Sequence, residues 1–238
     1  MTQAITTEHF TSRHDGEDYQ HFLSIAQGGG PRPAVLVFPN FLGLNQFDVD
    51  IAVRLAALGY AAVGCDLYGK GKRGGSREEG FALMQPLRED RALLQQRMAA
   101  ILATARGLPA VDPAQVAAIG FCFGGLCVLD LARTGADIKG AASFHGLFTP
   151  PGNLDGRPIR AKVIAFHGWA DAAVPPAQVV ALGEELTGVG ADWQIHCFGG
   201  AVHGFTHLDD AAGGVPFNQL AASRSWRTLE SFLEECFS

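Results

Sequence analysis

The chain has 238 residues, of which 47% are hydrophobic and 18% are charged, and its formal net charge is -6. This composition excludes a disordered chain and indicates a globular protein with a large core, and one domain over residues 1–238 is sufficient for an α/β fold of this length. The negative charge excludes a broad basic surface for nucleic acid, and no apolar run approaches the roughly eighteen residues that a membrane span requires.

The N-terminal residues Met1–Asp15 are polar and lack the apolar segment of a secretory signal. The chain contains five cysteines, an odd number without CxxC spacing: Cys65, Cys122, Cys127, Cys197 and Cys236. Both features favour reduced thiols over a disulfide framework and predict a cytoplasmic protein. We expect Cys65, Cys127 and Cys197 to lie in the core.

Short apolar runs alternate with helical patterns along the chain. The stretches Thr6–Phe10 and Tyr19–Ile25 predict a β-hairpin. Apolar runs predict buried strands at Ala34–Pro39, Tyr60–Cys65, Val116–Phe121, Ile138–His145, Lys162–His167 and Trp193–Phe198. Apolar residues at helical spacing predict helices at Phe47–Leu58, Ser76–Ala105 (kinked or interrupted at Pro86), Gly124–Thr134, Pro176–Leu186 and Gln219–Phe237. This order predicts a mainly parallel, twisted sheet with helices on both faces.

Residues Gly69–Gly74 read GKGKRG and match the spacing of a dinucleotide-binding loop. Such a loop should open directly into an amphipathic helix, whereas polar and glycine-rich residues follow here. The sequence therefore indicates a mobile loop over Gly69–Gly80 with solvated Lys70, Lys72 and Arg73, and no cofactor is expected.

The motif GFCFGG, residues 120–125, lies between a predicted strand and a predicted helix. A residue at the apex of so tight a turn needs small neighbours two places away on each side, and Gly120 and Gly124 supply them. The side chain of Cys122 would then be held above the sheet at a helix N-terminus, which favours a thiolate. The amide of Phe123 would point to a developing oxyanion. The alternative is a core cysteine beside a glycine turn.

Asp171 and His203 follow the next two predicted strands, in the segments HGWAD and GGAVHGF. The order nucleophile, acid, histidine is that of α/β-hydrolases, and strand-end loops are where sites in parallel sheets lie. His203 would take the thiol proton and later activate water, while Asp171 would fix its tautomer. The alternatives are a loop histidine and a helix-capping or turn aspartate.

These segments together resemble the dienelactone hydrolase family, a cysteine branch of the α/β-hydrolases. The resemblance extends from about Ala34 onward and includes Pro39–Asn45, Gly59–Gly69 and the cysteine elbow. It implies a single-domain α/β-hydrolase that cleaves a small-molecule ester or lactone, with Cys122 as nucleophile, Asp171 and His203 as its partners, and the Phe41 amide as a second oxyanion donor beside that of Phe123.

Two positions depart from the family members that open dienelactone. Asn40 replaces a glutamate that holds the thiol until substrate arrives, and His207 replaces an arginine for the substrate carboxylate, whereas Arg77 matches a second such arginine. These departures favour a neutral aryl ester or lactone and leave the anionic dienelactone open. Some relatives of this branch act on aryl phosphotriesters, which implies a secondary phosphotriesterase activity.

Apolar side chains on or near the strand-end loops predict a pocket suited to such substrates: Phe38, Phe41, Phe81, Met84, Phe148, Trp169 and Phe205. Core packing is the alternative for each of them. His203 and His207 are four residues apart, but Gly204 disfavours the helix that a zinc pair would need, so no metal is expected. We expect His145 and His167, which end two strands, to be hydrogen-bonded structural residues; the alternative is that either borders the pocket.

Two rival classes of function remain, and they differ in which of these residues they require. A non-catalytic ligand-binding module on the same fold would not need all three triad residues. A redox thiol protein would need a resolving cysteine, for which Cys127 is the candidate. We expect a monomer or a homodimer.

Overall fold

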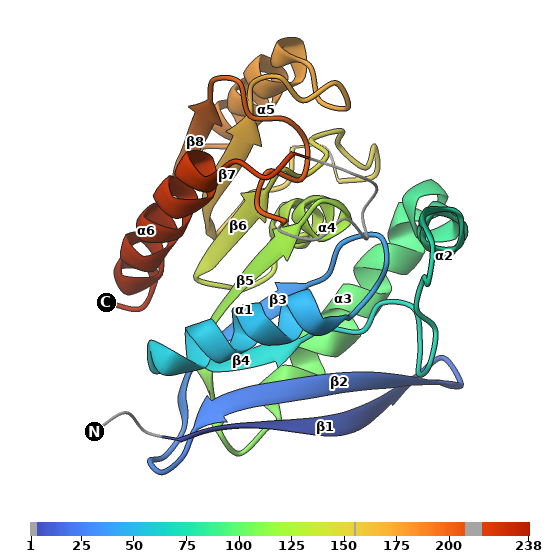
Figure 1. The fold of residues 1–238 in the computed structure, drawn as a ribbon, viewed down its shortest axis with the longest axis vertical. Helices are drawn as coiled ribbons and strands as arrows, with labels where there is room; N and C mark the ends of the chain where they lie inside the picture. Colours follow the sequence, from blue (N-terminus) through green and yellow to red (C-terminus); the bar gives the residue numbers. More distant parts are fainter. Residues whose placement is uncertain (1–3, 155, 208–215) are drawn as a thin grey trace. The chain divides into compact units, whose positions relative to one another are not determined.

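The computed structural model describes residues 4–154, 156–207 and 216–238. The chain forms two compact units, Met1–Ala118 and Ile119–Ser238, coloured from blue to green and from green to red in Figure 1. Eight strands form a sheet in the order β1-β2-β4-β3-β5-β6-β7-β8. Strands and helices alternate after the first hairpin, which confirms the predicted α/β class, while the single domain over residues 1–238 stays a prediction.

The first unit begins with a long antiparallel hairpin. Strand β1 (Ile5–His14) pairs with β2 (Glu17–Ala26) over its whole length. The two residues between them, Asp15 and Gly16, have φ values of 50° and 79°. Positive φ at both central residues is the hallmark of a type I′ turn, which matches the twist of the flanking strands. The predicted hairpin is confirmed, and it extends beyond the predicted ranges.

The next elements, β3 (Arg32–Phe38), α1 (Gln46–Ala57) and β4 (Ala61–Gly64), form a parallel β-α-β unit. Helix α1 begins at a capping box. The Asn45 side chain accepts from the Phe47 amide, and the Asp48 side chain accepts from the Asn45 amide, both at 2.9 Å. These reciprocal bonds satisfy orphan amides at the start of the helix. The predicted strands and helix are confirmed.

The segment predicted as one helix, kinked or interrupted at Pro86, forms two helices, α2 (Arg77–Glu89) and α3 (Arg91–Arg106). Pro86 lies inside α2 and the break is at Asp90, so an interruption at Pro86 is wrong, whereas a kink there stays a prediction. The Asp90 side chain accepts from the Leu93 amide at 2.9 Å and caps α3. A proline removes one N–H and crowds the carbonyl four residues before it, which can bend a helix without ending it. The Asp90 carboxylate instead caps the start of a second helix.

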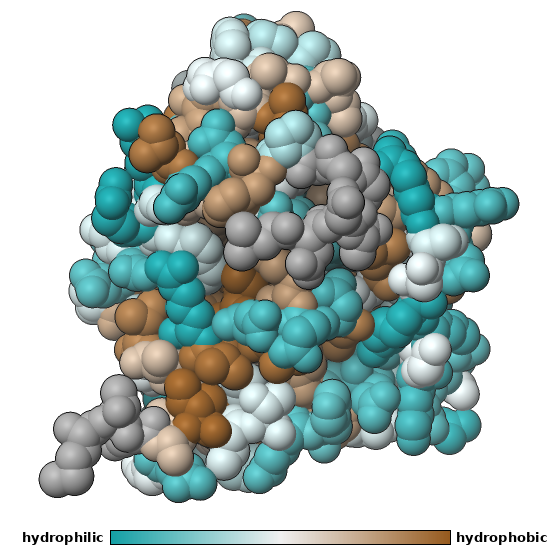
Figure 2. Space-filling model, in the orientation of Figure 1, coloured by the Kyte–Doolittle hydropathy of each residue, from teal (hydrophilic) through white to brown (hydrophobic). Residues whose placement is uncertain are grey.

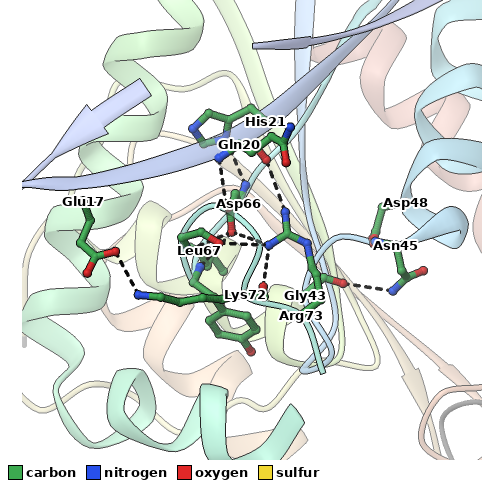
Figure 3. A network of polar contacts seen from close by, with 12 residues as sticks. Glu17, Gln20, His21, Gly43, Asn45, Asp48, Asp66, Leu67, Lys72 and Arg73 are labelled. Atoms are coloured by element: carbon green, nitrogen blue, oxygen red, sulfur yellow. Dashed lines mark hydrogen bonds and ion pairs between the residues drawn. The ribbon is translucent and has the colours of Figure 1, made fainter. Parts of the chain in front are cut away.

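The loop before α2 is held by a polar network rather than being fully solvated (Figure 3). The Arg73 guanidinium is half-buried and donates to the Asp66 carboxylate at 3.1 Å and to the carbonyl of Gln20 at 3.4 Å. Asp66 is itself buried. The prediction of a solvated Arg73 is therefore wrong.

The C-terminal part of the same predicted loop is also corrected. Ser76 caps α2 by accepting from the Glu79 amide at 3.2 Å, so Arg77–Gly80 is the first helical turn. Only the segment from Gly69 to Ser76 remains as a loop. Besides the contacts of Arg73, this loop makes a second contact, in which exposed Lys72 donates to Glu17 at 2.9 Å.

The second unit contains the end of β5 (Val111–Phe121) and the remaining strands: β6 (Gly140–Phe144), β7 (Lys162–Gly168) and β8 (Trp193–Phe198). Strands β6, β7 and β8 run parallel. Three helices belong to this unit: α4 (Phe123–Arg133), α5 (Pro176–Gly188) and α6 (Gln219–Cys236). The elements lie within a few residues of the predicted ranges.

Helices cover both faces of the strands in this unit. On one face the ring centres of Phe144 and Phe166 lie 4.6 Å apart with the rings tilted by 37°, and Trp226 of α6 packs against Phe144. On the other face Gly125 of α4 lies so close to Ser143 that a Cβ atom would be 2.7 Å from its hydroxyl. Alternate residues of a strand point to opposite faces, so α4 and α6 lie on opposite sides. The prediction of helices on both faces is confirmed for this unit.

Strand β8 is the last strand of the order given above, and its residues are only partly covered. Cys197 on this strand is exposed, so its predicted place in the core is wrong. Cys65 and Cys127 are fully buried, as predicted. An edge strand lacks a neighbour on one side, which leaves even apolar residues open to solvent.

The surface shows no extended apolar band on the face drawn in Figure 2, where polar residues separate groups of apolar ones. Six large apolar residues are exposed in the described part of the chain: Leu58, Phe81, Trp169, Val180, Phe217 and Leu220. Single exposed apolar residues are normal for globular proteins. No helix within the described ranges is long and apolar enough to cross a membrane.

Candidate active site

Cys122 forms the turn between β5 and α4, with backbone angles φ 54° and ψ -110°. A Cβ atom on Gly120 would lie 2.1 Å from the carbonyl oxygen of Gly124, so only glycine fits there. The predicted strand–turn–helix geometry is confirmed. A backbone in so sparsely populated a region costs about 1–3 kcal/mol and persists only where its surroundings hold it.

Two acceptors hold the amide of Cys122. One is the carbonyl oxygen of Phe144 at 3.0 Å, and the other is Nδ1 of His145 at 3.2 Å. The carbonyl of Cys122 accepts from the Leu126 amide at 3.2 Å, which starts α4. The side chain is partly exposed, which argues against the alternative of a core cysteine.

Cys122, His203 and Asp171 form a continuous chain of hydrogen bonds. Nε2 of His203 lies 3.0 Å from Sγ of Cys122, and Nδ1 of His203 lies 2.8 Å from Oδ2 of Asp171. Asp171 is buried, and its other oxygen accepts from the Ala173 amide at 2.8 Å. The carboxylate therefore has a fixed direction, and it fixes the imidazole in turn.

The electrostatics of this chain favour a positively charged imidazole. Burial lowers the pKa of His203, but the hydrogen bonds to Asp171 and Cys122 outweigh burial and raise its pKa to about 10. At neutral pH the imidazole is thus an imidazolium beside the sulfur, which is the arrangement that stabilises a thiolate. The positive charge of the imidazole therefore lies beside Sγ of Cys122.

Phe123 is the first residue of α4 and directly follows Cys122. Amide N–H groups in the first turn of a helix point outward along the axis, and the positive end of the helix dipole lies there. Such an amide, adjacent to Cys122, suits the stabilisation of an oxyanion. The role of the Phe123 amide as an oxyanion donor stays a prediction.

Four other predicted site residues, Asn40, Phe41, Arg77 and Phe81, belong to the first unit. The Phe41 and Phe81 rings stack at 5.0 Å, and the Arg77 guanidinium lies 5.1 Å from the Phe81 ring centre. Asn40 is buried and its side chain accepts from the Leu42 amide at 2.9 Å. The structure thus brings three of the four together, and their action on substrate stays a prediction.

Three further predicted site residues, Trp169, Phe205 and His207, have different surroundings in the second unit. Trp169 is 48% exposed, just before Asp171. Phe205 is fully buried and its ring packs at 5.4 Å against His145. His207 is buried, with its ring also 5.4 Å from that of His145. Trp169 can therefore meet a ligand directly, whereas Phe205 and His207 form the support behind the triad.

The two strand-end histidines differ. His145 is hydrogen-bonded through both ring nitrogens, to the Cys122 amide and to Oγ1 of Thr206 at 2.8 Å. His167 is fully buried, and neither of its ring nitrogens has a hydrogen-bond partner among the described residues, so the prediction is wrong for His167. The contact of His145 with Thr206 is one that the sequence did not reveal, because the two residues are 61 positions apart.

The geometry around His203 and His207 also bears on the zinc alternative. Neither residue lies on a helix: His203 begins a turn, and His207 directly follows that turn. Within the described ranges, no group of three or more His, Cys, Asp or Glu side chains is placed to hold a metal ion. His203 is instead committed to Asp171 and Cys122.

Comparisons with known proteins agree on one family. The dienelactone hydrolase family profile matches residues 21–237. The solved structure called m3DLH is 36% identical with a TM-score of 0.92, and covers 99% of this chain and 100% of its own. The crystal structure of a dienelactone hydrolase-like promiscuous phosphotriesterase from metagenomic libraries is 34% identical with a TM-score of 0.91, at the same coverage. A relative from Synechocystis sp. with the provisional name carboxymethylenebutenolidase is 29% identical and covers 98% of each chain.

Proposed function

The chain belongs to the dienelactone hydrolase family, and from this premise we propose that it cleaves a carboxylic ester or lactone through a thioester on Cys122. The observation that carries the proposal is the pair of hydrogen bonds that join Sγ of Cys122, the imidazole of His203 and the carboxylate of Asp171. Nucleophile, base and orienting group are the three parts that acyl transfer requires. The family match and the α/β-hydrolase fold agree with the resemblance found in the sequence.

The first half of the reaction forms the thioester. The sulfur of Cys122 attacks the carbonyl carbon, and the carbonyl oxygen becomes an oxyanion that the Phe123 amide stabilises. The tetrahedral intermediate collapses when the bond to the leaving oxygen breaks and the His203 imidazolium gives that oxygen its proton. An alcohol leaves from an ester, whereas a lactone opens and keeps its new hydroxyl on the acyl group.

The second half returns the enzyme to its resting state. His203 is now neutral and takes a proton from water, whose oxygen attacks the thioester carbon. The C–S bond breaks, the carboxylic acid leaves, and the imidazolium again lies beside the thiolate. The loss of negative charge on sulfur in the thioester removes one of the interactions that raise the pKa of His203, so the imidazole becomes a base when a base is needed.

The substrate that we propose is a neutral aryl ester or lactone. Asn40 and His207 do not offer the fork of donors with which an arginine binds a carboxylate. The Arg77 guanidinium lies over the Phe81 ring, so its charge already has an aromatic partner. An apolar setting with few charged groups suits an aryl ring better than an anion.

A second activity, on aryl phosphotriesters, is supported by one comparison. The promiscuous phosphotriesterase named above is 34% identical over nearly the whole chain. A thiolate beside an oxyanion donor can attack phosphorus as well as carbon. Turnover of paraoxon above that of a Cys122→Ala control is the expected result, and equal rates would remove this activity from the proposal.

The test of the main proposal uses p-nitrophenyl acetate and butyrate. We expect Cys122→Ala to abolish hydrolysis and Cys122→Ser to retain little of it. The matched control is Cys197→Ser, which alters an exposed cysteine outside the triad and should leave kcat unchanged. Wild-type activity in Cys122→Ala would overturn the assignment.

The same variants separate the two rival classes. A ligand-binding module would react with a thiol reagent at Cys122 but show no turnover of any ester. A redox protein would lose two thiols together on peroxide treatment, yet the candidate resolving residue Cys127 is fully buried in α4. The burial of Cys127 therefore favours the hydrolase. A cytoplasmic location and a monomeric or homodimeric state stay predictions.

A further inference from the structure

One buried imidazole contacts both the turn of Cys122 and the segment that carries His203. His145 directly follows β6, and its Nδ1 accepts from the backbone amide of Cys122 at 3.2 Å. Its Nε2 lies 2.8 Å from Oγ1 of Thr206. Thr206 belongs to the same turn as His203. The side chain of His145 thus spans from the nucleophile turn to the loop of the catalytic histidine.

The hydrogen bonds fix the protonation state of His145. A backbone amide can only donate, so Nδ1 must carry no proton. A neutral imidazole with an empty Nδ1 has its proton on Nε2 and donates it to Thr206. Burial, together with the neighbouring His203 and His207, holds the pKa of His145 well below its ordinary value. The neutral tautomer is therefore the stable form.

The ring of His145 is enclosed by other rings. The centres of the His203, Phe205 and His207 rings each lie 5.4 Å away, and that of Phe121 lies 6.0 Å away. His145 has no exposed surface. A side chain packed in this way keeps its orientation, because tilting the ring would displace several neighbours.

The backbone at both ends of the contact is strained. Cys122 has a φ of 54° and His145 has a φ of 39°, and both are L residues that rarely adopt such values. The Cys122 amide shares its proton between Phe144 and His145. The bond from His145 is thus one of the contacts that keep the strained turn in place.

We propose that His145 is a positioning residue that ties the turn of Cys122 to the loop of His203 through Thr206, and so keeps sulfur and imidazole at hydrogen-bond distance. This inference rests on the proposed role of Cys122. It assigns the two bonds of His145 separate tasks. The bond at Nδ1 sets the sulfur, and the bond at Nε2 sets the loop that carries the base.

Two substitutions of His145 separate the two bonds. In His145→Asn the side-chain oxygen lies near the place of Nδ1, which keeps the acceptor for Cys122 and removes the donor to Thr206. In His145→Gln the side-chain nitrogen lies near the place of Nε2, which keeps the donor and removes the acceptor. Thr206→Val removes the hydroxyl with little change of shape, and Thr206→Ser restores it.

We expect kcat for p-nitrophenyl acetate to fall about 10- to 100-fold in both His145 variants and in Thr206→Val, because small displacements of reacting groups cost this much. KM should stay within about twofold, and Thr206→Ser should recover most of kcat. The double variant His145→Asn with Thr206→Val should be no slower than the worse single variant, since both remove the same bond.

A second readout does not depend on ester hydrolysis. In a Cys197→Ser background, the rate of Cys122 alkylation by iodoacetamide, followed from pH 5 to 10, reports the pairing of thiolate with imidazolium. The His145 and Thr206→Val variants should show a slower rate and a shifted pH profile. Far-UV and near-UV circular dichroism then show whether each variant is folded.

The outcomes separate the inference from the proposed function. Folded His145 and Thr206→Val variants with wild-type kcat and a wild-type alkylation profile would refute the positioning role while leaving the hydrolase intact. Strictly additive losses in the double variant would refute it as well. Wild-type hydrolysis in Cys122→Ala would instead refute the proposed function, and the alkylation profile would still decide whether His145 positions the thiol.

Discussion

The substitution Gly120→Ala tests the geometry of the nucleophile turn most directly. A Cβ atom at position 120 would lie 2.1 Å from the Gly124 carbonyl oxygen and 2.2 Å from its carbonyl carbon, whereas ordinary contact begins at 3.4 Å. Both obstacles are backbone atoms, which cannot swing aside. The start of α4 must therefore move away from the end of β5 by about 1 Å, and Cys122 lies between them.

A displacement of this size has two measurable consequences. Overpacking of this kind costs about 1–3 kcal/mol in stability, which circular dichroism in urea can detect. Misplacement of a reacting group by about 1 Å costs roughly 100-fold in rate. We therefore expect kcat for p-nitrophenyl acetate to fall about 100-fold in the fraction of protein that remains folded.

The matched control is Gly199→Ala. Gly199 lies on the loop that leads to His203, yet a Cβ atom there would meet nothing within 4 Å. Its activity and stability should stay close to those of the wild type. A folded Gly120→Ala variant with wild-type kcat would refute the claim that the tight turn sets the position of the sulfur.

Three further predictions follow from the electrostatics. Asp171→Asn should lower kcat about 1,000- to 10,000-fold with little change in KM, because the amide no longer fixes the tautomer of His203; steady-state kinetics decide this, and a loss below tenfold would contradict it. Because the pKa of His203 is raised to about 10, the imidazolium is present below that pH and lost above it. We therefore expect kcat/KM for an ethyl ester to fall above pH 10 more steeply than for a p-nitrophenyl ester, whose leaving group needs no proton. Parallel pH profiles for the two esters would contradict this. Burial raises the pKa of Asp48 to about 7 from 3.8, so the folded state holds this proton more tightly than the unfolded state and loses stability as the pH rises from 4 through 7. The variant Asp48→Asn keeps an acceptor for the Asn45 amide but carries no charge. In urea unfolding it should be more stable than the wild type by about 2–4 kcal/mol at pH 8 but not at pH 4. An equal difference in stability at both pH values would contradict this.

The sequence was sufficient for the elements whose signals are local. Glycines two places on either side of Cys122 predicted the turn because the clash at Gly120 involves only residues nearby in the chain. The order of Cys122, Asp171 and His203 predicted the triad because parallel strands bring their carboxyl ends to one edge. Both predictions depend on rules that act within a few residues or on the direction of strands.

Features that depend on tertiary contacts could not be predicted in this way. The bond between His145 and Thr206 joins residues that no local pattern connects. Arg73 looked solvated because Asp66 and Gln20, which hold it, are distant in the chain. Cys197 looked buried because an apolar strand has the same sequence pattern in the middle of a sheet and at its edge.

The break between α2 and α3 shows how two local signals compete. Pro86 and Asp90 both disfavour a continuous helix, and the sequence alone does not rank them. The Asp90 amide still donates to the carbonyl of Pro86 at 2.9 Å, and its side chain accepts from the Leu93 amide. Asp90 thus ends α2 with its amide and caps α3 with its side chain, whereas a break at Pro86 would gain neither hydrogen bond.

Asn40 shows how a departure from the family pattern can be explained without reference to substrate. Its side-chain oxygen accepts from the Leu42 amide at 2.9 Å, and its carbonyl accepts from the Gly43 amide at 3.1 Å. These two bonds close the turn after β3, and an uncharged amide closes it as well as a carboxylate would. An amide cannot take a proton from a thiol, so a glutamate's role of holding that proton has no counterpart at this position. Within the second unit, the raised pKa of His203 keeps a proton on the imidazole beside Sγ of Cys122 at neutral pH.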